Sequence, residues 1–126
     1  MAFKKVATGL QHIGVPTNDI AKTIAFYESL GFEVAHRTQN GDEQVAFLKL
    51  GDLMIETYQN FKAVGINGAV DHIAINVTDV DEARRIADEM KLEVIEADQL
   101  PFWDNGVKYF VILGPNKEKI EFNQYL

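Results

Sequence analysis

Two histidines and two glutamates of the chain recur at equivalent positions. The segment LQHIGVPTNDIAKTIAFYESLGFEV matches the later segment VDHIAINVTDVDEARRIADEMKLEV at an offset of sixty residues, which aligns His12 with His72. Towards the ends of the same two copies, Glu56 aligns with Glu121 at an offset of sixty-five residues. Imidazole and carboxylate groups are common ligands of divalent metal ions. The repeat therefore indicates metal chemistry built from two similar halves.

The two copies predict the same order of elements around these residues. Each begins with a short strand, at 10–15 and 70–77, followed by a helix of regular apolar spacing. Gly31 is predicted to end the first helix in a left-handed conformation, and Lys91 holds the matching place. The helices are expected to start at capping residues, Asn18 or Asp19 and Thr78 or Asp79, and to bury Ile20, Ile24, Tyr27, Leu30, Val80, Ala83, Ile86, Ala87 and Met90.

Three strand-like runs follow each helix. They read FEVAHRT, EQVAFLKL and LMIETYQ in the first copy, and LEVIEADQ, VKYFVIL and EKIEFNQ in the second. The sequence thus predicts an α+β fold within one domain, 1–126. Two tandem βαβββ modules, 8–59 and 71–126, joined by a linker at 60–70, are expected to form a curved eight-stranded mixed sheet around a metal-binding cleft. The residues added in the second copy fall in the loop 98–106 and in the last hairpin.

Strand alternation predicts the direction of the four repeated side chains. Successive strand residues point to opposite faces, so apolar neighbours on the helix side place His12, Glu56, His72 and Glu121 on the other side. A single histidine or glutamate on a strand is more often hydrogen-bonded or solvated than functional. Recurrence of both types on the same face favours a metal site, because converging carboxylates and imidazoles need a cation between them.

Composition excludes several other classes of function. The 126 residues include no cysteine, so disulfides, zinc–thiolate sites and thiol nucleophiles are absent. The net charge of -7 argues against nucleic acid, whose affinity depends on Lys and Arg contacts with phosphate. No segment approaches the roughly 20 apolar residues of a membrane span, and no secretory signal is evident. We expect a cytoplasmic protein with a small-molecule substrate, no nucleic-acid partner and no membrane association.

On these motifs the chain resembles the vicinal oxygen chelate superfamily of glyoxalases, bleomycin resistance proteins and dioxygenases. The resemblance rests on HIGVPTNDIAKTIAFYESLGF, MIETYQN, DHIAINVTDVDEA and GPNKEKIEF, and it covers nearly the whole chain. The His–Glu–His–Glu set is most similar to bacterial glyoxalase I, a lactoylglutathione lyase. The resemblance implies that His12, Glu56, His72 and Glu121 are the metal ligands, and that Glu121 or Glu56 shuttles a proton.

Other positions either match or depart from that enzyme. The resemblance implies that Asn60 contacts a glutathione moiety. Pro16 replaces an arginine that grips a glutathione carboxylate in glyoxalase I, and QLPFWDNGVKYF replaces a long glycine-containing loop. Because of these departures, the resemblance does not determine whether the protein uses a thiol, or which thiol it would use.

The predicted chemistry is a lyase or isomerase reaction dependent on one divalent ion: Ni, Zn, Co, Mn or Fe. The ion would stabilise an enediolate while a glutamate moves a proton on a small oxygenated substrate or thiol adduct. Two alternatives remain: another metalloenzyme of the superfamily (an epimerase, a thiol transferase or a dioxygenase), or a metal-free protein that binds a small molecule.

Pocket walls and assembly are less strongly marked. Phe102 and Trp103 could cover the site or pack on a sheet edge, and Met54 and Tyr58 flank Glu56 on the expected cleft face. Arg37 could hold a substrate carboxylate, although a solvated arginine is the commoner case, and His36 has no counterpart and is interpreted as structural. A homodimer is expected, because sheet edges need covering, with sites possibly at the interface.

Overall fold

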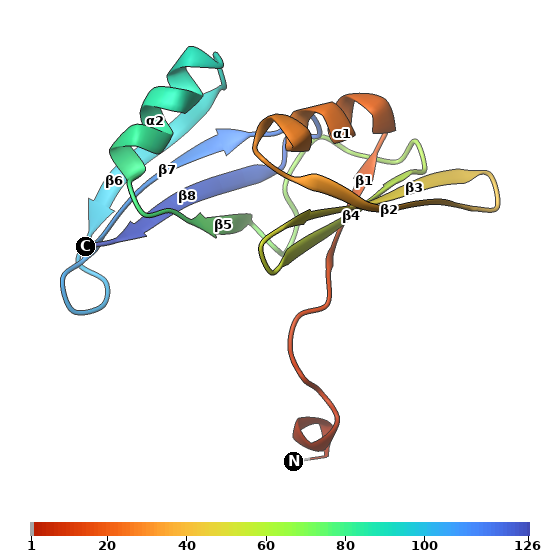
Figure 1. Ribbon diagram of the computed structural model, residues 1–126, viewed down its shortest axis with the longest axis horizontal. Coiled ribbons are helices and arrows are strands. Elements are labelled where there is room, and N and C mark those ends of the chain that lie inside the picture. The colour runs from red at the N-terminus through yellow and green to blue at the C-terminus, as the bar shows by residue number, and fades with distance from the viewer. Residues whose placement is uncertain (1) are drawn as a thin grey trace. The chain divides into compact units, whose positions relative to one another are not determined.

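The computed structural model describes residues 2–126 (Figure 1). The chain divides into two compact units, Met1–Ala63 and Val64–Leu126, and the boundary lies within the segment expected to be a linker. In the described part of the chain, no helix is long and apolar enough to cross a membrane.

The first unit carries one α-helix on one face of a four-stranded sheet (Figure 1). The strand order is β1-β4-β3-β2, with β1 parallel to β4 and the other neighbours antiparallel. Its elements are a 3₁₀ turn η1 (Phe3–Lys5), β1 (Ile13–Thr17), α1 (Ile20–Ser29), β2 (Glu33–Asn40), β3 (Glu43–Leu50) and β4 (Leu53–Gln59).

The second unit repeats this arrangement, with strand order β5-β8-β7-β6. The predicted α+β fold of two βαβββ modules is therefore confirmed, and the eight strands form two hydrogen-bonded sheets of four. One boundary differs from expectation: β1 begins at Ile13, so His12 lies immediately before the strand. The elements are β5 (His72–Asn76), α2 (Val80–Glu89), β6 (Val94–Leu100), β7 (Val107–Leu113) and β8 (Lys119–Tyr125).

Both helices begin at an aspartate. The Asp19 carboxylate accepts a hydrogen bond from the Lys22 amide at 3.0 Å, and Asp79 accepts one from Glu82 at the same distance. These bonds satisfy backbone donors that the first helical turn leaves unpaired. At the other end, Lys91 adopts a left-handed conformation with φ of 56°, as Gly31 does with φ of 101°.

A glutamine from the last strand of each unit also holds the helix start. Gln59 Oε1 accepts from the Ile20 amide, and Gln124 Oε1 accepts from the Val80 amide, both at 2.9 Å. Each bond ties the helix to the strand beside the first strand of its unit. The glutamine bond thus fixes the start of the helix against the sheet in both units, and none of the repeated histidines or glutamates takes part in it.

The helix-facing side of each sheet forms the core. Ile24, Tyr27, Leu48 and Ile55 are buried in the first unit. In the second, the fully buried large side chains are Phe110, Ile112 and Ile120.

The predicted helix burial was partly wrong. Leu30 and Ala83 are only half-buried, and Ile86 and Met90 are exposed at 44% and 36%. Leu30 and Met90 are the C-caps of α1 and α2 and lie just beyond the helices. Within α2, Val80 and Ala87 face the sheet and the Arg84 guanidinium lies over the Phe110 ring at 5.8 Å, which leaves Ile86 outside the core.

A β-bulge in each unit shifts the alternation of side chains. The register of β2 against β3 shifts between Val34, opposite Leu48, and His36, opposite Phe47. Beyond the shift Arg37 lies opposite Ala46, a buried residue of the helix-facing side. Because a bulge inserts one residue, every later side chain changes face. The same shift occurs between Val94 and Glu96 in β6.

Candidate metal centre

The first unit brings one histidine and one glutamate together on the sheet face that lies away from α1. Glu56 is paired with Gly14 across the parallel strands, and His12 lies two residues before that glycine. His12 Nε2 lies 3.7 Å from Glu56 Oε1, with side-chain exposures of 34% and 28%. The Phe47 ring meets the imidazole edge-on, with the ring centroids 5.8 Å apart.

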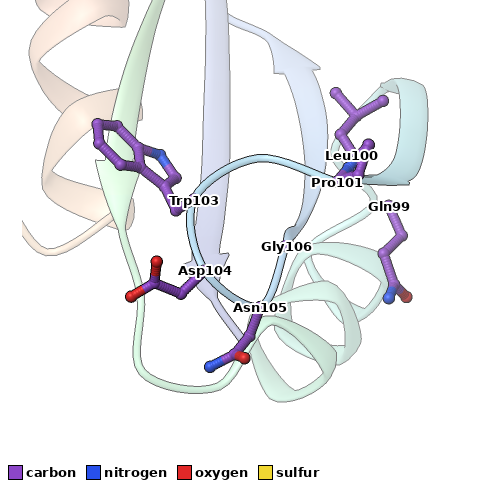
Figure 2. A pocket seen from close by; sticks show the side chains of 7 residues that line it. All are labelled: Gln99, Leu100, Pro101, Trp103, Asp104, Asn105 and Gly106. Atoms are coloured by element: carbon purple, nitrogen blue, oxygen red, sulfur yellow. The ribbon is translucent and has the colours of Figure 1, made fainter.

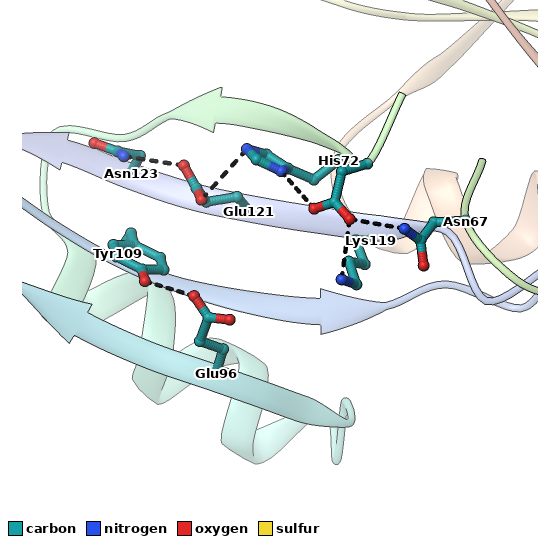
Figure 3. Close-up of polar contacts among 8 residues, drawn as sticks. Asn67, His72, Glu96, Tyr109, Lys119, Glu121 and Asn123 are labelled. Atoms are coloured by element: carbon teal, nitrogen blue, oxygen red, sulfur yellow. Dashed lines mark hydrogen bonds and ion pairs between the residues drawn. The ribbon is translucent and has the colours of Figure 1, made fainter. Parts of the chain in front are cut away.

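The second unit repeats this pair. His72 Nε2 lies 3.7 Å from Glu121 Oε1, and Glu121 is the more enclosed carboxylate, with 13% of its side chain exposed. The Asn123 amide donates to Glu121 Oε2 at 3.0 Å (Figure 3). One glutamate oxygen thus faces the imidazole while the other is held by an amide.

The residue before each histidine fixes the orientation of its ring. His12 Nδ1 lies 2.9 Å from Gln11 Oε1, and His72 Nδ1 lies 3.0 Å from Asp71 Oδ2. A carboxylate oxygen can only accept, so a neutral His72 carries its proton on Nδ1 and leaves the Nε2 lone pair facing Glu121. An oxygen acceptor on the outer ring nitrogen is the usual partner of a metal-binding histidine.

The separation of 3.7 Å is informative about what each pair can do. It exceeds the range of about 2.7–3.2 Å for a direct N–H···O hydrogen bond. A nitrogen and an oxygen bound to one ion at about 2.1 Å each lie about 3.0–3.4 Å apart, for bond angles between octahedral and tetrahedral. A closure of a few tenths of an ångström would therefore make each pair a chelating half-site. Within the described residues, no three or more His, Asp or Glu side chains gather into a group that could hold a metal.

The two half-sites differ in the charge behind the histidine. Asp71 also accepts from Asn67 Nδ2 at 2.7 Å and from Lys119 Nζ at 3.2 Å (Figure 3). The hydrogen bonds from His72 and Lys119 lower the pKa of Asp71 below its ordinary value. His72 is thus backed by a carboxylate, whereas the corresponding residue behind His12 is the neutral Gln11.

The other residues predicted for the site are distributed unevenly. Met54 and Tyr58 lie on the same face as Glu56, and Tyr58 packs against Gly14, where an added Cβ would be 3.4 Å from its ring. Asn60 follows β4, and its side chain accepts from the Lys62 amide at 2.9 Å. Arg37 lies on the helix-facing side because of the bulge, and donates to Gln44 at 3.1 Å.

Phe102 and Trp103 belong to the loop between β6 and β7. Since β6 extends to Leu100, this loop comprises residues 101–106. Both aromatic side chains are exposed, at 54% and 76%.

From the sequence, His36 is interpreted as structural and neither Glu96 nor Tyr109 is singled out, yet all three lie on the same sheet faces as the His–Glu pairs. The bulges bring His36 opposite Phe47, and Glu96 opposite Val111, onto the same faces as Glu56 and Glu121. Tyr109 donates to Glu96 (Figure 3), and this hydrogen bond, with burial, raises the pKa of Tyr109 to about 12. The available signal was the sixty-residue offset itself, which aligns His36 with Glu96 just as it aligns Gln11 with Asp71.

The chain is similar to several known proteins. It is 33% identical to YwbC, an uncharacterized protein of Bacillus subtilis (strain 168), over 94% of this chain and 99% of the relative. Its fold matches a lactoylglutathione lyase from Agrobacterium tumefaciens with a TM-score of 0.71 and 18% identity, covering 94% of this chain and 95% of that one. It also matches a fosfomycin resistance protein, FosX, from Listeria monocytogenes with a TM-score of 0.77 and 17% identity, covering 96% of each chain.

Sequence similarity extends over both βαβββ units. The profile described as Glyoxalase/Bleomycin resistance protein/Dioxygenase superfamily matches residues 9–122, a span that includes both histidines and both glutamates. The chain therefore belongs to the glyoxalase/bleomycin resistance protein/dioxygenase superfamily.

Proposed function

We propose that His12, Glu56, His72 and Glu121 together bind one divalent metal ion in a glyoxalase I-like lyase or isomerase. The observation that supports this most is the recurrence of a His–Glu pair at 3.7 Å in each unit, with Nδ1 facing an oxygen acceptor both times. Neither pair alone offers more than two ligands, and a metal site needs about four. Ni, Zn, Co, Mn and Fe are all compatible with two imidazoles and two carboxylates.

In this proposal the side chains of the chain orient the metal ligands and transfer the proton. When bound, the ion would act as a Lewis acid towards oxygens of a small substrate or thiol adduct. His12 and His72 hold their ring orientation through Gln11 and Asp71. A glutamate oxygen takes a proton from one carbon and returns it to the neighbouring carbon.

The environments of the two glutamates favour Glu56 as the residue that moves the proton. Glu121 has one oxygen occupied by Asn123 and is the more enclosed of the two. Glu56 makes no hydrogen bond with the described residues beyond its approach to His12, and 28% of its side chain is exposed. An oxygen without a competing donor is better able to accept a proton. Glu121 would then act chiefly as a fixed ligand.

Metal analysis of the purified protein tests the site. We expect about one equivalent of divalent metal per site after reconstitution, and a loss of metal in the single variants His12→Ala and His72→Ala. Arg37→Ala is the matched control, because Arg37 lies on the opposite sheet face from Glu56 and should leave the metal content unchanged. Less than about half an equivalent after reconstitution would exclude the metal function.

Activity with methylglyoxal and a series of thiols tests the reaction. A proton-transferring carboxylate contributes about 10²–10⁴-fold to a rate, so Glu56→Gln should lower kcat by at least about 10²-fold in metal-loaded protein. Glu121→Gln should weaken metal binding more than Glu56→Gln does. The assignment fails if Glu56→Gln turns over at the normal rate.

The two alternative functions, another metalloenzyme or a metal-free binding protein, predict different results in the same assays. A metalloprotein without product from methylglyoxal and any thiol would favour epimerase, thiol transferase or dioxygenase chemistry on this scaffold. The fold is similar to that of a fosfomycin resistance protein, so conversion of fosfomycin is the next reaction to assay. A protein that binds no metal, either as purified or after reconstitution, would instead favour a small-molecule-binding role.

We further infer a homodimer, in which the two units pair either within one chain or between two chains. Mixing His12→Ala with His72→Ala distinguishes these arrangements. Pairing between chains gives mixed dimers with one intact set of four ligands, so metal binding and activity return. Pairing within a chain leaves every site defective. Sedimentation as a monomer at micromolar concentration would contradict the dimer.

A further inference from the structure

The second unit contains a small pocket beside the His72–Glu121 pair. Its volume is about 150 Å³, and it lies on the sheet face away from α2, since Asn76 and Asn123 are register partners two residues beyond the Ala74–Glu121 pair. The lining residues are Ala74, Asn76, Phe102, Trp103, Val107, Asn123 and Tyr125. All of them belong to the second unit.

The walls of the pocket are aromatic. Phe102, Trp103 and Tyr125 have exposures of 54%, 76% and 62%, which leaves much of their ring surface available to a ligand. The Trp103 and Tyr125 rings meet edge-on with centroids 6.0 Å apart. A cavity of about 150 Å³ is large enough for one six-membered ring.

The loop that carries the aromatic residues is held in an uncommon conformation. Trp103 has φ of 59°, a left-handed backbone that large side chains rarely adopt. Gly106 closes the loop where a Cβ would lie 2.9 Å from the Leu100 carbonyl oxygen, and its own carbonyl accepts from the Leu126 amide at 3.0 Å. In Figure 2 the Trp103 indole projects from the side of the loop opposite Leu100 and Pro101. Backbone strain of this kind tends to occur where a side chain is positioned for a ligand.

The polar groups of the pocket are neutral and only partly used. The Asn76 side chain makes no hydrogen bond to any described residue, so both its carbonyl and its NH₂ group are available. Asn123 donates to Glu121 and keeps its carbonyl oxygen as an acceptor. The lining includes no charged side chain, while Glu96 and Glu121 lie on the same sheet face and would repel an anion.

We propose that this pocket binds the planar, uncharged part of the ligand: an aromatic ring that carries a carboxamide or a similar neutral donor–acceptor pair. The ring would pack against Trp103 and Tyr125, and its polar group would bond to Asn76 and Asn123. Because Asn123 lines the pocket and also donates to Glu121, the pocket lies directly next to Glu121. Its role as a substrate subsite rests on the proposed metal function, whereas ring binding itself can be measured without metal.

Trp103 is the only tryptophan of the chain, and it lines both this pocket and the larger hollow within the loop, so its fluorescence reports a ligand bound at either place. The experiment titrates the full-length protein, freed of metal by a chelator, with benzamide, benzoate and cyclohexanecarboxamide. Benzamide should change the emission saturably, with a Kd of about 0.1–5 mM for a ligand of this size. Benzoate and cyclohexanecarboxamide should bind at least about 5-fold more weakly, because one is anionic and the other is not planar.

Matched variants assign the signal to the pocket. Asn76→Ala should weaken benzamide binding at least about 5-fold. Asn105→Ala should leave it unchanged, because Asn105 lines the larger hollow of about 510 Å³ within the loop but not this pocket (Figure 2). Equal binding of benzoate, or unaltered binding by Asn76→Ala, would overturn the proposal. An emission maximum that shifts with protein concentration alone would also overturn it, since a second copy would then cover Trp103.

The same design separates this proposal from the metal function. If the protein takes up its metal but does not bind benzamide, the proposed ring-binding pocket is refuted and the metal function is not. Ring binding retained in a protein that never binds metal would refute its role as a subsite of a metal centre.

Discussion

Exchanging the residues behind the two histidines should change metal affinity in opposite directions. Asp71→Asn keeps an oxygen acceptor for His72 Nδ1 but removes its negative charge, which makes the second half-site resemble the first. Gln11→Glu makes the reverse change behind His12, where the acceptor lies 2.9 Å from Nδ1. A charged acceptor increases the basicity of the other ring nitrogen and so strengthens its bond to a metal.

The structure limits the size of the effect. Loss of an outer-shell partner costs about 10–100-fold in metal affinity. Asp71 is 52% exposed and shares its charge with Lys119 and Asn67, so solvent and these donors already weaken its influence on His72. We therefore expect about a 10-fold loss for Asp71→Asn, at the lower end of that range, and a gain of a few-fold for Gln11→Glu.

Competition with a chromogenic chelator measures these affinities. Because Asp71 is exposed, the loss should be larger at low than at high ionic strength. Asp98→Asn serves as the control, since this exposed carboxylate of β6 accepts from the Gln99 amide and contacts neither histidine in the described part of the chain; it should change affinity less than about 2-fold. Equal affinities for wild type and Asp71→Asn at low salt would refute the proposed role of the charge.

Three further predictions concern the units themselves. The raised pKa of Tyr109 means that its neutral hydroxyl stabilises the fold fully below about pH 10, and that this contribution is lost as the pH rises through about 12. In absorbance titrations at 295 nm, Tyr109→Phe should therefore remove one late-titrating tyrosine. Gln59→Leu removes the acceptor for the Ile20 amide and should lower the free energy of unfolding by about 1 kcal/mol in urea titrations; no change would show that water replaces the glutamine. Ile120→Ala, at 1% exposure, should cost about 2–5 kcal/mol, whereas Ile95→Ala at 42% exposure should cost less than about 1 kcal/mol.

Much of each βαβββ unit was predictable because its determinants are local. Alternating apolar residues specify strands, apolar spacing of three and four specifies the helices, and the aspartates that start both helices are recognisable caps. The repeat reinforced each of these signals by presenting it twice. The same local logic predicted that Glu56 and Glu121 point away from the helices, which the strand registers confirm.

The errors arose where alternation is interrupted or where packing chooses between similar residues. Arg37 was considered as a possible partner of a substrate carboxylate, but the bulge after Val34 places it on the sheet face opposite to Glu56. Ile86 was expected in the core, yet α2 is rotated so that the Arg84 guanidinium lies over Phe110 instead. Neither a bulge nor the rotation of a helix is encoded in a simple periodic pattern, because both depend on contacts with neighbouring strands.

The sequence by itself determined the types and the repetition of the candidate ligands, since His12, Glu56, His72 and Glu121 can be aligned without any coordinates. Only the tertiary structure decided how each pair is arranged: the 3.7 Å approach of Nε2 to a glutamate oxygen, and the oxygen acceptor on each Nδ1. The physical reason is distance along the chain. Each glutamate is more than forty residues from its histidine, and only the parallel pairing of the first and last strands brings them together. The same pairing places Asn76 beside Asn123 and so forms the pocket next to Glu121.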